Sequence, residues 1–342
     1  MRTAGPDISG PPADAPLLPS YGQTSLADLS DSLLASLGVP GASNPLGLAP
    51  YSRACLLLVD GLGWELLRSH RSVAPFLSGL AETGCWLTAG FPATTATSLG
   101  SLGTARPPGQ HGLLGYQVRV PDTGQLLNEL RWDNAVDPVR WQPGPTIFER
   151  TAAAGIAAIR VAAGAFRMSG LSVATMRGAD YHAADTPGAL VASTAAALAA
   201  ERRALALVYT GDLDATGHTW GCESPAWRFQ LGHVDRLAEQ LAGALPSGAV
   251  LYVTAGPAAR LRGAGSGSRR VRGVAVSAGR PRVGRAPRRG HRGGLVRPGG
   301  QLVRCAHRRR GRGGARRVSG GGDAGRAARV GSRGHARLPD AR

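Results

Sequence analysis

Continuous apolar runs punctuate the chain between residues 51 and 255. The run 54–59 ends at an Asp-Gly pair, the run 204–209 leads into an acidic Asp-Leu-Asp segment, and a third run covers 249–255. Short runs that are apolar at every position are typical of strands buried on both faces of a parallel sheet. The sequence therefore predicts three central strands here, and two weaker strands at 85–89 and 156–162.

Helical spacing of apolar positions separates these strands. Strands alternating with helices indicate βαβ units, so we predict an α/β fold with a mainly parallel sheet flanked by helices. In such sheets ligands bind at the carboxyl ends of the strands, and Asp60, Asp212 and Asp214 follow strand ends. Residues 112–145 look irregular and predict an inserted loop or small cap. The predicted helices cover 25–37, 63–70, 73–82, 94–103, 146–155, 187–203 and 224–245.

The first 50 residues are rich in Pro, Ala, Ser and Leu, and we expect a loosely ordered N-terminal arm with one short helix. The segment has no basic stretch followed by an apolar core, which a signal peptide would show. No apolar run reaches the ~20 residues that span a bilayer, so no membrane partner is expected. Four Cys without close pairing favour a reducing compartment, and we expect a cytoplasmic protein.

The composition changes abruptly after Ala255. Of the 40 Arg and 22 acidic residues, 24 Arg and only two acids lie from Gly256 onward, so the net charge is +22 there and −4 before it. That segment also lacks Phe, Trp, Tyr, Ile, Met, Asn, Thr and Glu. Its main residues, such as Gly, Ala, Arg and Pro, are those that GC-rich codons encode in any reading frame. We interpret 256–342 as a low-complexity Arg/Gly/Ala tail without a core, produced by a frameshift. A genuine tail that binds polyanions non-specifically is the alternative, and no specific nucleic-acid partner is expected.

Three groups of residues before the break could carry chemistry. Asp214 and His218 form an Asp-x-x-Gly-His pattern, a ligand pair that Zn²⁺ accepts, although the pattern alone favours a surface Asp and a helix-capping His. Asp60 follows a buried strand, where it could bind a metal or cap the next helix. Thr94 and Thr95 follow a Pro at a predicted helix start, where free backbone N–H groups suit phosphate and a metal could activate a hydroxyl.

Together these pieces resemble the alkaline phosphatase superfamily, most closely its nucleotide pyrophosphatase/phosphodiesterase branch. The resemblance covers roughly residues 53–255 and implies an alkaline-phosphatase-like α/β core at 51–255, here incomplete, with 1–50 and 256–342 outside it. The matching pieces are Leu58-Val59-Asp60-Gly61, Phe91-Pro92 with Thr95, Gly109-Gln110-His111-Gly112, Tyr209 with Asp212 to His218, and Leu251 to Ala255.

The resemblance implies a metal-dependent phosphoester hydrolase whose two Zn²⁺ ions clamp a phosphoryl group, with a small-molecule phosphoester, such as a nucleotide, as substrate. By position, Thr95 is the nucleophile between the metals and Asp60 binds one metal. Asp214 and His218 bind the other. Thr94, His111 and Asp212 are expected in supporting or structural places.

The chain departs from the family directly after Ala255. There the family continues into Asp-His-Gly, whose Asp and His complete the metal site of Asp60, and a later His completes the site of Asp214 and His218. Here Gly256-Pro257-Ala258 follows instead. Because zinc catalytic sites normally use three protein ligands, the chain as written is predicted to be inactive or nearly so.

Other readings stay open. A phosphomonoesterase or another superfamily member would use similar residues, since the residues that distinguish monoesters from diesters cannot be placed. A sulfatase nucleophile pattern is absent from 91–98, and Thr95 counts mildly against mutases, which commonly use Ser. The reading from a different class is a non-catalytic, polyanion-binding protein that acts through the Arg-rich tail.

Overall fold

A seven-stranded sheet forms the centre of the computed structural model, which describes residues 18–132, 136–256 and the backbone of 272–278. The strand order is β2-β9-β8-β1-β7-β5-β6. β1, β5, β6, β7 and β8 are parallel, and β9 runs antiparallel to both β8 and β2. The strands are β1 (Arg53–Val59), β2 (Cys85–Thr88), β5 (Ala157–Ala162), β6 (Asp180–Ala183), β7 (Ala204–Thr210), β8 (Ala249–Ala255) and β9 (Arg272–Ala278).

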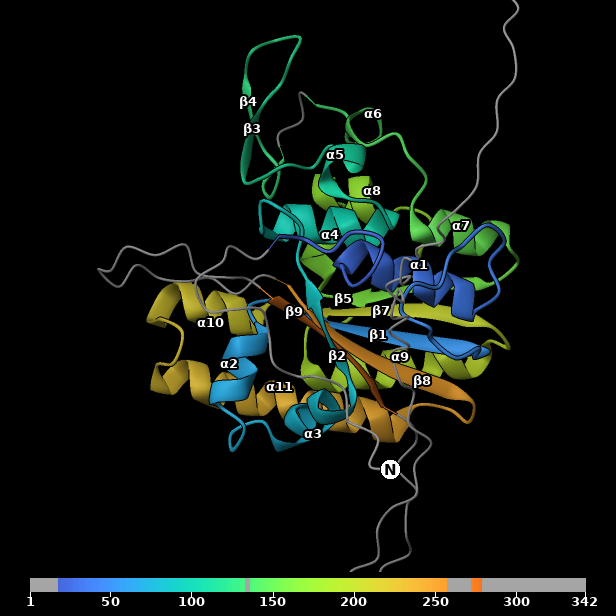
Figure 1. The fold of residues 1–342 in the computed structure, drawn as a ribbon, viewed down its shortest axis with the longest axis vertical. Helices are drawn as coiled ribbons and strands as arrows, with labels where there is room; N and C mark the ends of the chain where they lie inside the picture. The colour runs from blue at the N-terminus through green and yellow to red at the C-terminus, as the bar shows by residue number, and fades with distance from the viewer. Residues whose placement is uncertain (1–17, 133–135, 257–271, 279–342) are drawn as a thin grey trace, which may run out of the picture. The chain divides into compact units, whose positions relative to one another are not determined.

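Helices cover both faces of this sheet (Figure 1), so the predicted α/β class is confirmed. One face packs against α1 (Leu26–Ser36), α4 (Thr95–Thr104), α7 (Ile147–Ala153) and α8 (Gly170–Met176). The other face packs against α2 (Trp64–Ser69), α3 (Pro75–Thr83), α9 (Pro187–Ala200) and α11 (Pro225–Ala244). The remaining elements are α5 (Pro108–His111), β3 (Gln117–Arg119), β4 (Leu126–Asn128), α6 (Pro138–Trp141), η1 (Gly164–Phe166) and α10 (Asp212–Trp220).

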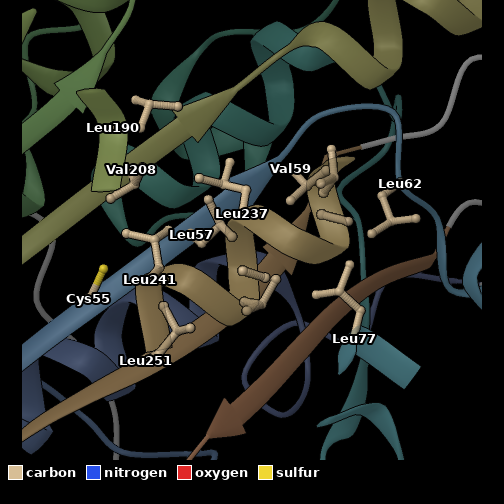
Figure 2. Packing of buried hydrophobic residues seen from close by; sticks show 14 of the residues in the cluster. Cys55, Leu57, Val59, Leu62, Leu77, Leu190, Val208, Leu237, Leu241 and Leu251 are labelled. Atoms are coloured by element: carbon tan, nitrogen blue, oxygen red, sulfur yellow. The ribbon is translucent and has the colours of Figure 1, made fainter. Parts of the chain in front are cut away.

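The three central strands form because their runs are apolar at every position. Within β1 each residue from Ala54 to Val59 is buried, and alternate residues enter the cores on opposite faces. Figure 2 shows one of these cores, in which Leu57 of β1 and Leu251 of β8 lie against Leu237 and Leu241 of α11. Burial of such side chains stabilises the fold by about 1.5–3 kcal/mol each, before the conformational entropy that opposes it.

The N-terminal segment differs from the expected loose arm from residue 18 onward. Ser25 and Asp28 form a capping box, in which the Ser25 hydroxyl accepts from the Asp28 N–H and the Asp28 carboxylate accepts from the Ser25 N–H. Leu26, Leu29 and Leu33 of α1 are fully buried against the sheet. The expectation was wrong here because the apolar spacing of α1 outweighs the surrounding Pro- and Ser-rich composition.

The segment after Ala255 also contains an element that the sequence analysis did not predict. β9 pairs with β8 through Val253 opposite Val276 and with β2 through Cys85 opposite Ala275. Alternating Val274 and Val276 suit a strand. The structure thus pairs residues 272–278 as a strand within the segment interpreted as a low-complexity tail, and the rest of that segment lies outside the described residues.

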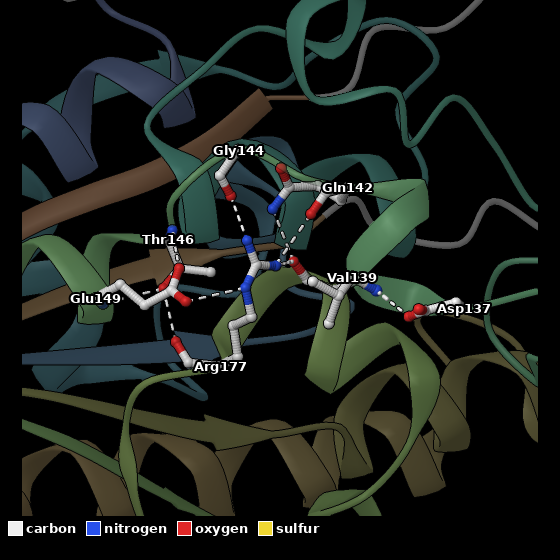
Figure 3. A network of polar contacts seen from close by, with 8 residues as sticks. Asp137, Val139, Gln142, Gly144, Thr146, Glu149 and Arg177 are labelled. Atoms are coloured by element: carbon white, nitrogen blue, oxygen red, sulfur yellow. Dashed lines mark hydrogen bonds and ion pairs between the residues drawn. The ribbon is translucent and has the colours of Figure 1, made fainter.

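The irregular segment 112–145 is a short β3–β4 hairpin followed by the one-turn helix α6. Its end is fixed to α7 and α8 by the Arg177 network in Figure 3. The Arg177 guanidinium donates to the carbonyls of Gln142, Gly144 and Ala174, and its Nε lies 3.1 Å from Glu149 Oε1. This network holds the end of the segment 112–145 against the helices on the face of the sheet that packs against α4.

No helix in 18–132 or 136–256 combines the length and apolar character that crossing a membrane requires.

Candidate active site

Asp60 lies directly after β1, at the carboxyl edge of the sheet, with 3% of its surface exposed. Its Oδ2 accepts a hydrogen bond from the Tyr209 hydroxyl at 2.9 Å, and its Oδ1 accepts from the Gly61 N–H at 3.1 Å. The pKa of Asp60 is raised to about 7 in total: burial raises it most, the charge of Asp214 also raises it, and hydrogen bonds from Tyr209, Gly61 and Thr95 oppose the shift. Two carboxylates and a threonine hydroxyl therefore meet at this edge.

Gly61 brings the two carboxylates together. Its φ is +78°, a left-handed conformation that glycine adopts without strain. A Cβ at this position would lie 2.5 Å from Asp214 Cα, so the start of α10 packs directly on the Asp60–Gly61 turn. The approach of Asp214 to Asp60 depends on this close packing.

The Asp-x-x-Gly-His residues lie on one face of α10. Asp214 and His218 are one helical turn apart, with the His218 Nε2 3.4 Å from Asp214 Oδ2. The His218 side chain is 63% exposed, whereas that of Asp214 is only 19% exposed. Asp212 is exposed in the first turn of α10, where its carbonyl accepts from the Thr216 hydroxyl, so it starts the helix.

The two threonines at the start of α4 have different partners. Thr94 is the N-cap, and its hydroxyl accepts from the Thr97 N–H at 3.2 Å and donates to the Thr97 hydroxyl at 2.9 Å. Thr95 is the first helical residue, and its hydroxyl bonds the Asp60 carboxylate. The N-terminus of α4 also offers unpaired backbone N–H groups and the positive end of the helix dipole.

His111 lies behind α4, away from the carboxylates. It is 2% exposed, its Nδ1 accepts from the Leu113 N–H at 3.1 Å, and its Nε2 lies 3.2 Å from Ser101 Oγ. The ring packs so closely on Gly100 that a Cβ there would lie 2.5 Å from its Cε1. Burial lowers the pKa of His111 to about 4. These contacts support α4 and do not reach Asp60.

Gly256 directly follows β8, at the position where the resemblance leads us to expect an Asp. Its N–H donates to the Val59 carbonyl at 3.0 Å, which aligns it with the end of β1. A Cβ at Gly256 would lie 2.3 Å from Asp60 Oδ1, so a side chain at this position would point at the Asp60 carboxylate. Within the described part of the chain, no three His, Cys, Asp or Glu residues gather closely enough to hold a metal. The donors present are pairs, and they do not fit a metal site with three protein ligands.

Tyr209 belongs to this site, although the sequence analysis treats it only as the end of a strand and part of a motif. Its hydroxyl donates to Asp60, and its ring meets the Phe166 ring edge-on at 5.6 Å. Burial and the neighbouring Asp60 raise the pKa of Tyr209, so the phenol stays protonated and remains a donor. The available signal is a phenol at the end of an otherwise apolar strand, three residues before Asp212.

The sequence profile of a protein family described as type I phosphodiesterase/nucleotide pyrophosphatase matches residues 54–255. Two solved structures of murine ectonucleotide pyrophosphatase/phosphodiesterase 5 are similar, at 19% identity with TM-score 0.48, and at 18% identity with TM-score 0.47. The second is of an inactive threonine-to-alanine variant in complex with AMP. Each comparison covers 60% of this chain and 57% of the murine chain, so the chain spans a little over half the length of these relatives. No curated protein sequence matches the chain.

Proposed function

Because this chain belongs to the type I phosphodiesterase/nucleotide pyrophosphatase family, we propose that it carries the framework of a phosphoester hydrolase but turns substrate over slowly or not at all. The proposed substrate is a small-molecule phosphoester of the nucleotide type. A cytoplasmic location is proposed as well, because the four scattered cysteines of the sequence favour a reducing compartment.

Thr95 is the proposed nucleophile. Its hydroxyl bonds Asp60, whereas the Thr94 hydroxyl is committed to capping α4. In the proposed step Asp60 would accept the hydroxyl proton while the Thr95 oxygen forms a bond to phosphorus and the ester oxygen leaves with the electrons of its bond to phosphorus. The free N–H groups at the start of α4 suit the negative charge of the phosphoryl group. This arrangement supports Thr95 over Thr94.

Hydrolases of this family type depend on divalent metal ions, with Zn²⁺ the proposed ion here. In a frame-corrected chain, Asp60 would contribute to one ion site, and Asp214 with His218 would contribute to the other. Bound metal would supply charge neutralisation on the phosphoryl oxygens. Each described donor set has only one or two members, so we derive no step that depends on the metal.

One observation supports the proposed loss of activity most directly. The Cβ direction of Gly256 points at Asp60 Oδ1, and glycine offers no ligand there. A frameshift after Ala255 would remove the expected Asp and His at the one place where they complete the Asp60 site. The support for the proposed loss of activity therefore comes from the position of Gly256 beside Asp60.

Resequencing the coding DNA across codons 250–262 is the first test. We expect a neighbouring frame to continue Val-Thr-Ala into Asp-His-Gly and then into a sequence that contains acids. If no frame does so, the frameshift is refuted and the tail is genuine. Removing 256–342 should then abolish retention on immobilised nucleic acid at low salt.

Activity tests the rest of the proposal. With Zn²⁺ present, the 342-residue chain should hydrolyse bis(p-nitrophenyl) phosphate at close to the background rate. The frame-corrected chain should hydrolyse it well and prefer it to p-nitrophenyl phosphate, and Thr95→Ala should abolish that turnover. Ser98→Ala is the matched control, because the buried Ser98 hydroxyl on the same helix has no hydrogen-bond partner. Robust turnover by the chain as written, lost in Thr95→Ala, would contradict the proposed inactivity.

A further inference from the structure

The N-terminal segment 18–25 passes beside the end of β2. The Ser20 N–H donates to the Thr88 hydroxyl at 2.8 Å, and the Thr88 N–H donates to the Thr24 carbonyl at 2.8 Å. Thr88 is 1% exposed, so water competes little for these hydrogen bonds. The segment is therefore bound to the last residue of β2, directly before the loop 89–94 that leads into α4.

Asp28 fixes the turn that follows Tyr21. Its buried carboxylate accepts from the N–H groups of Gly22 at 3.0 Å, Gln23 at 3.1 Å and Ser25 at 2.8 Å. Hydrogen bonds to a carboxylate are shorter and stronger than those between neutral groups. Gly22 has a φ of +77°, a left-handed conformation that glycine adopts without strain. The position of Tyr21 is thus set by α1, the helix to which Asp28 belongs.

Tyr21 also contacts the loop before α4, which is only partly buried. The Phe91 side chain is 79% exposed, and Pro92 and Thr94 are half-buried. The Phe91 N–H donates to the Tyr21 hydroxyl at 3.3 Å, and the Thr94 N–H donates to the Pro92 carbonyl at 3.0 Å. Tyr21 therefore joins the N-terminal segment to the loop four residues before Thr95.

We propose that Tyr21 is a positioning residue that holds the start of α4, and with it Thr95, beside Asp60. This inference rests on the proposed function, in which Thr95 is the nucleophile. Thr95 bonds Asp60 from the first position of α4, so its hydroxyl keeps this partner only while the helix starts at the same place. A reacting group displaced by about 1 Å can lose about 100-fold in rate, so a contact outside the site is able to affect the reaction.

The amide of Thr97 reports where α4 starts. The Thr94 hydroxyl accepts from this N–H at 3.2 Å and so caps the first turn of the helix. The N–H groups of a first turn have no partner within the helix, and their protection from solvent depends on such a cap. A shift of the loop at Phe91 would weaken the cap and speed exchange of the Thr97 amide. If the role of Tyr21 were purely local, only the Phe91 amide would change.

Hydrogen exchange of the 342-residue chain, followed by NMR at residue resolution, tests this without turnover or metal. Tyr21→Phe keeps the ring and loses only an exposed hydroxyl, so the variant should fold normally. We expect the amides of Phe91 and Thr97 to exchange about threefold faster or more, as the loss of one hydrogen bond implies. The amide of Leu237 in α11 should keep its rate. Tyr116→Phe is the matched control, because Tyr116 is 49% exposed and Tyr21 is 40% exposed.

Two glycine substitutions change the turn itself. Gly22 and Gly41 have similar left-handed φ values, +77° and +72°, and both have open space where a Cβ would lie. Alanine therefore strains either turn to a similar extent without a clash. Gly22→Ala should speed exchange of the Thr97 amide, because its turn follows Tyr21 directly. Gly41→Ala should leave that rate unchanged.

The proposal is refuted if the Thr97 amide keeps its rate in Tyr21→Phe, even where the Phe91 amide changes, because the effect then ends at the hydrogen bond itself. It is also refuted if either control variant accelerates Thr97 equally. Equal acceleration of Leu237 would refute it too, since the effect would then be one of global stability. Failure of the proposed function is distinguishable, because it would show as absent turnover in the frame-corrected chain while these exchange rates behave as expected.

Discussion

His111 should make the folded state sensitive to mild acid. Its Nδ1 accepts from the Leu113 N–H, and its Nε2 bonds Ser101, so the buried ring is neutral and has no place for a second proton. Burial lowers its pKa to about 4, from 6.5 in an exposed histidine. The unfolded chain therefore binds more protons than the folded chain between those two values.

The sign and size follow from that difference. Stability rises with pH wherever the unfolded state holds more protons, so the contribution of His111 is fully present above pH 6.5 and is lost as the pH falls toward 4. A shift of about 2.5 pKa units corresponds to about 3 kcal/mol, at about 1.4 kcal/mol per unit. This is a large fraction of the 5–15 kcal/mol typical of a domain.

Urea unfolding of the wild-type chain and of His111→Gln, followed by circular dichroism in EDTA at pH 4.5, 5.5 and 7.5, measures this effect. Glutamine keeps a polar side chain that does not titrate, so the variant should lose about 1–2 kcal/mol less than the wild type between pH 7.5 and 5.5. Other titrating groups, such as Asp60 and Asp235, cancel in the comparison. Equal pH slopes for the two proteins, or an NMR titration that places the pKa of His111 above 6, would refute the reasoning.

Three further substitutions test the packing around the site. Arg177→Ala should lower the free energy of unfolding by about 2–4 kcal/mol, because it removes the donors to three carbonyls and the contact with Glu149 shown in Figure 3. Urea unfolding measures this loss, and a change below about 0.5 kcal/mol would contradict the prediction. Leu33→Ala in α1 should cost about 2–5 kcal/mol by the same assay, whereas an unstable arm would give no effect. Gly61→Ala should cost about 2 kcal/mol or more, since its φ is left-handed and the new Cβ meets Asp214. Gly79→Ala in α3, with open space around it and an ordinary φ, is the control that should be at least as stable as the wild type, because alanine is favoured over glycine in a helix.

The sequence predicts the strongly apolar elements of this fold and misses the polar ones. β1, β7 and β8 are continuous apolar runs, so their residues alone predict burial on both faces of the sheet. β6 is a half-exposed edge strand of mixed character, and its sequence alone does not distinguish it from a loop. α10 is polar and contains Gly217, so its helix depends on packing against the Asp60–Gly61 turn, which is a tertiary contact.

The candidate site divides in the same way. Motif spacing identifies Asp60, Thr95 and Asp214, and the structure brings these three together at one sheet edge. Their roles in catalysis stay predictions. The hydrogen bond from Tyr209 to Asp60 is not predicted, because a tyrosine at the end of an apolar strand has the same sequence pattern whether its hydroxyl meets a carboxylate or water.

The central position of β8 sets the order in which the sheet can assemble during synthesis. β1 pairs with β8 across a separation of 196 positions, so β1 leaves the ribosome long before its neighbour exists. At 5–20 residues per second this interval is about 10–40 s, during which the apolar β1 depends on chaperones or transient contacts. A reading-frame change after Ala255 comes just after β8 is complete. It therefore spares the pairing of β7, β1 and β8 and removes only what is translated afterwards, which is how a gene can lose a metal ligand and still encode a folded sheet.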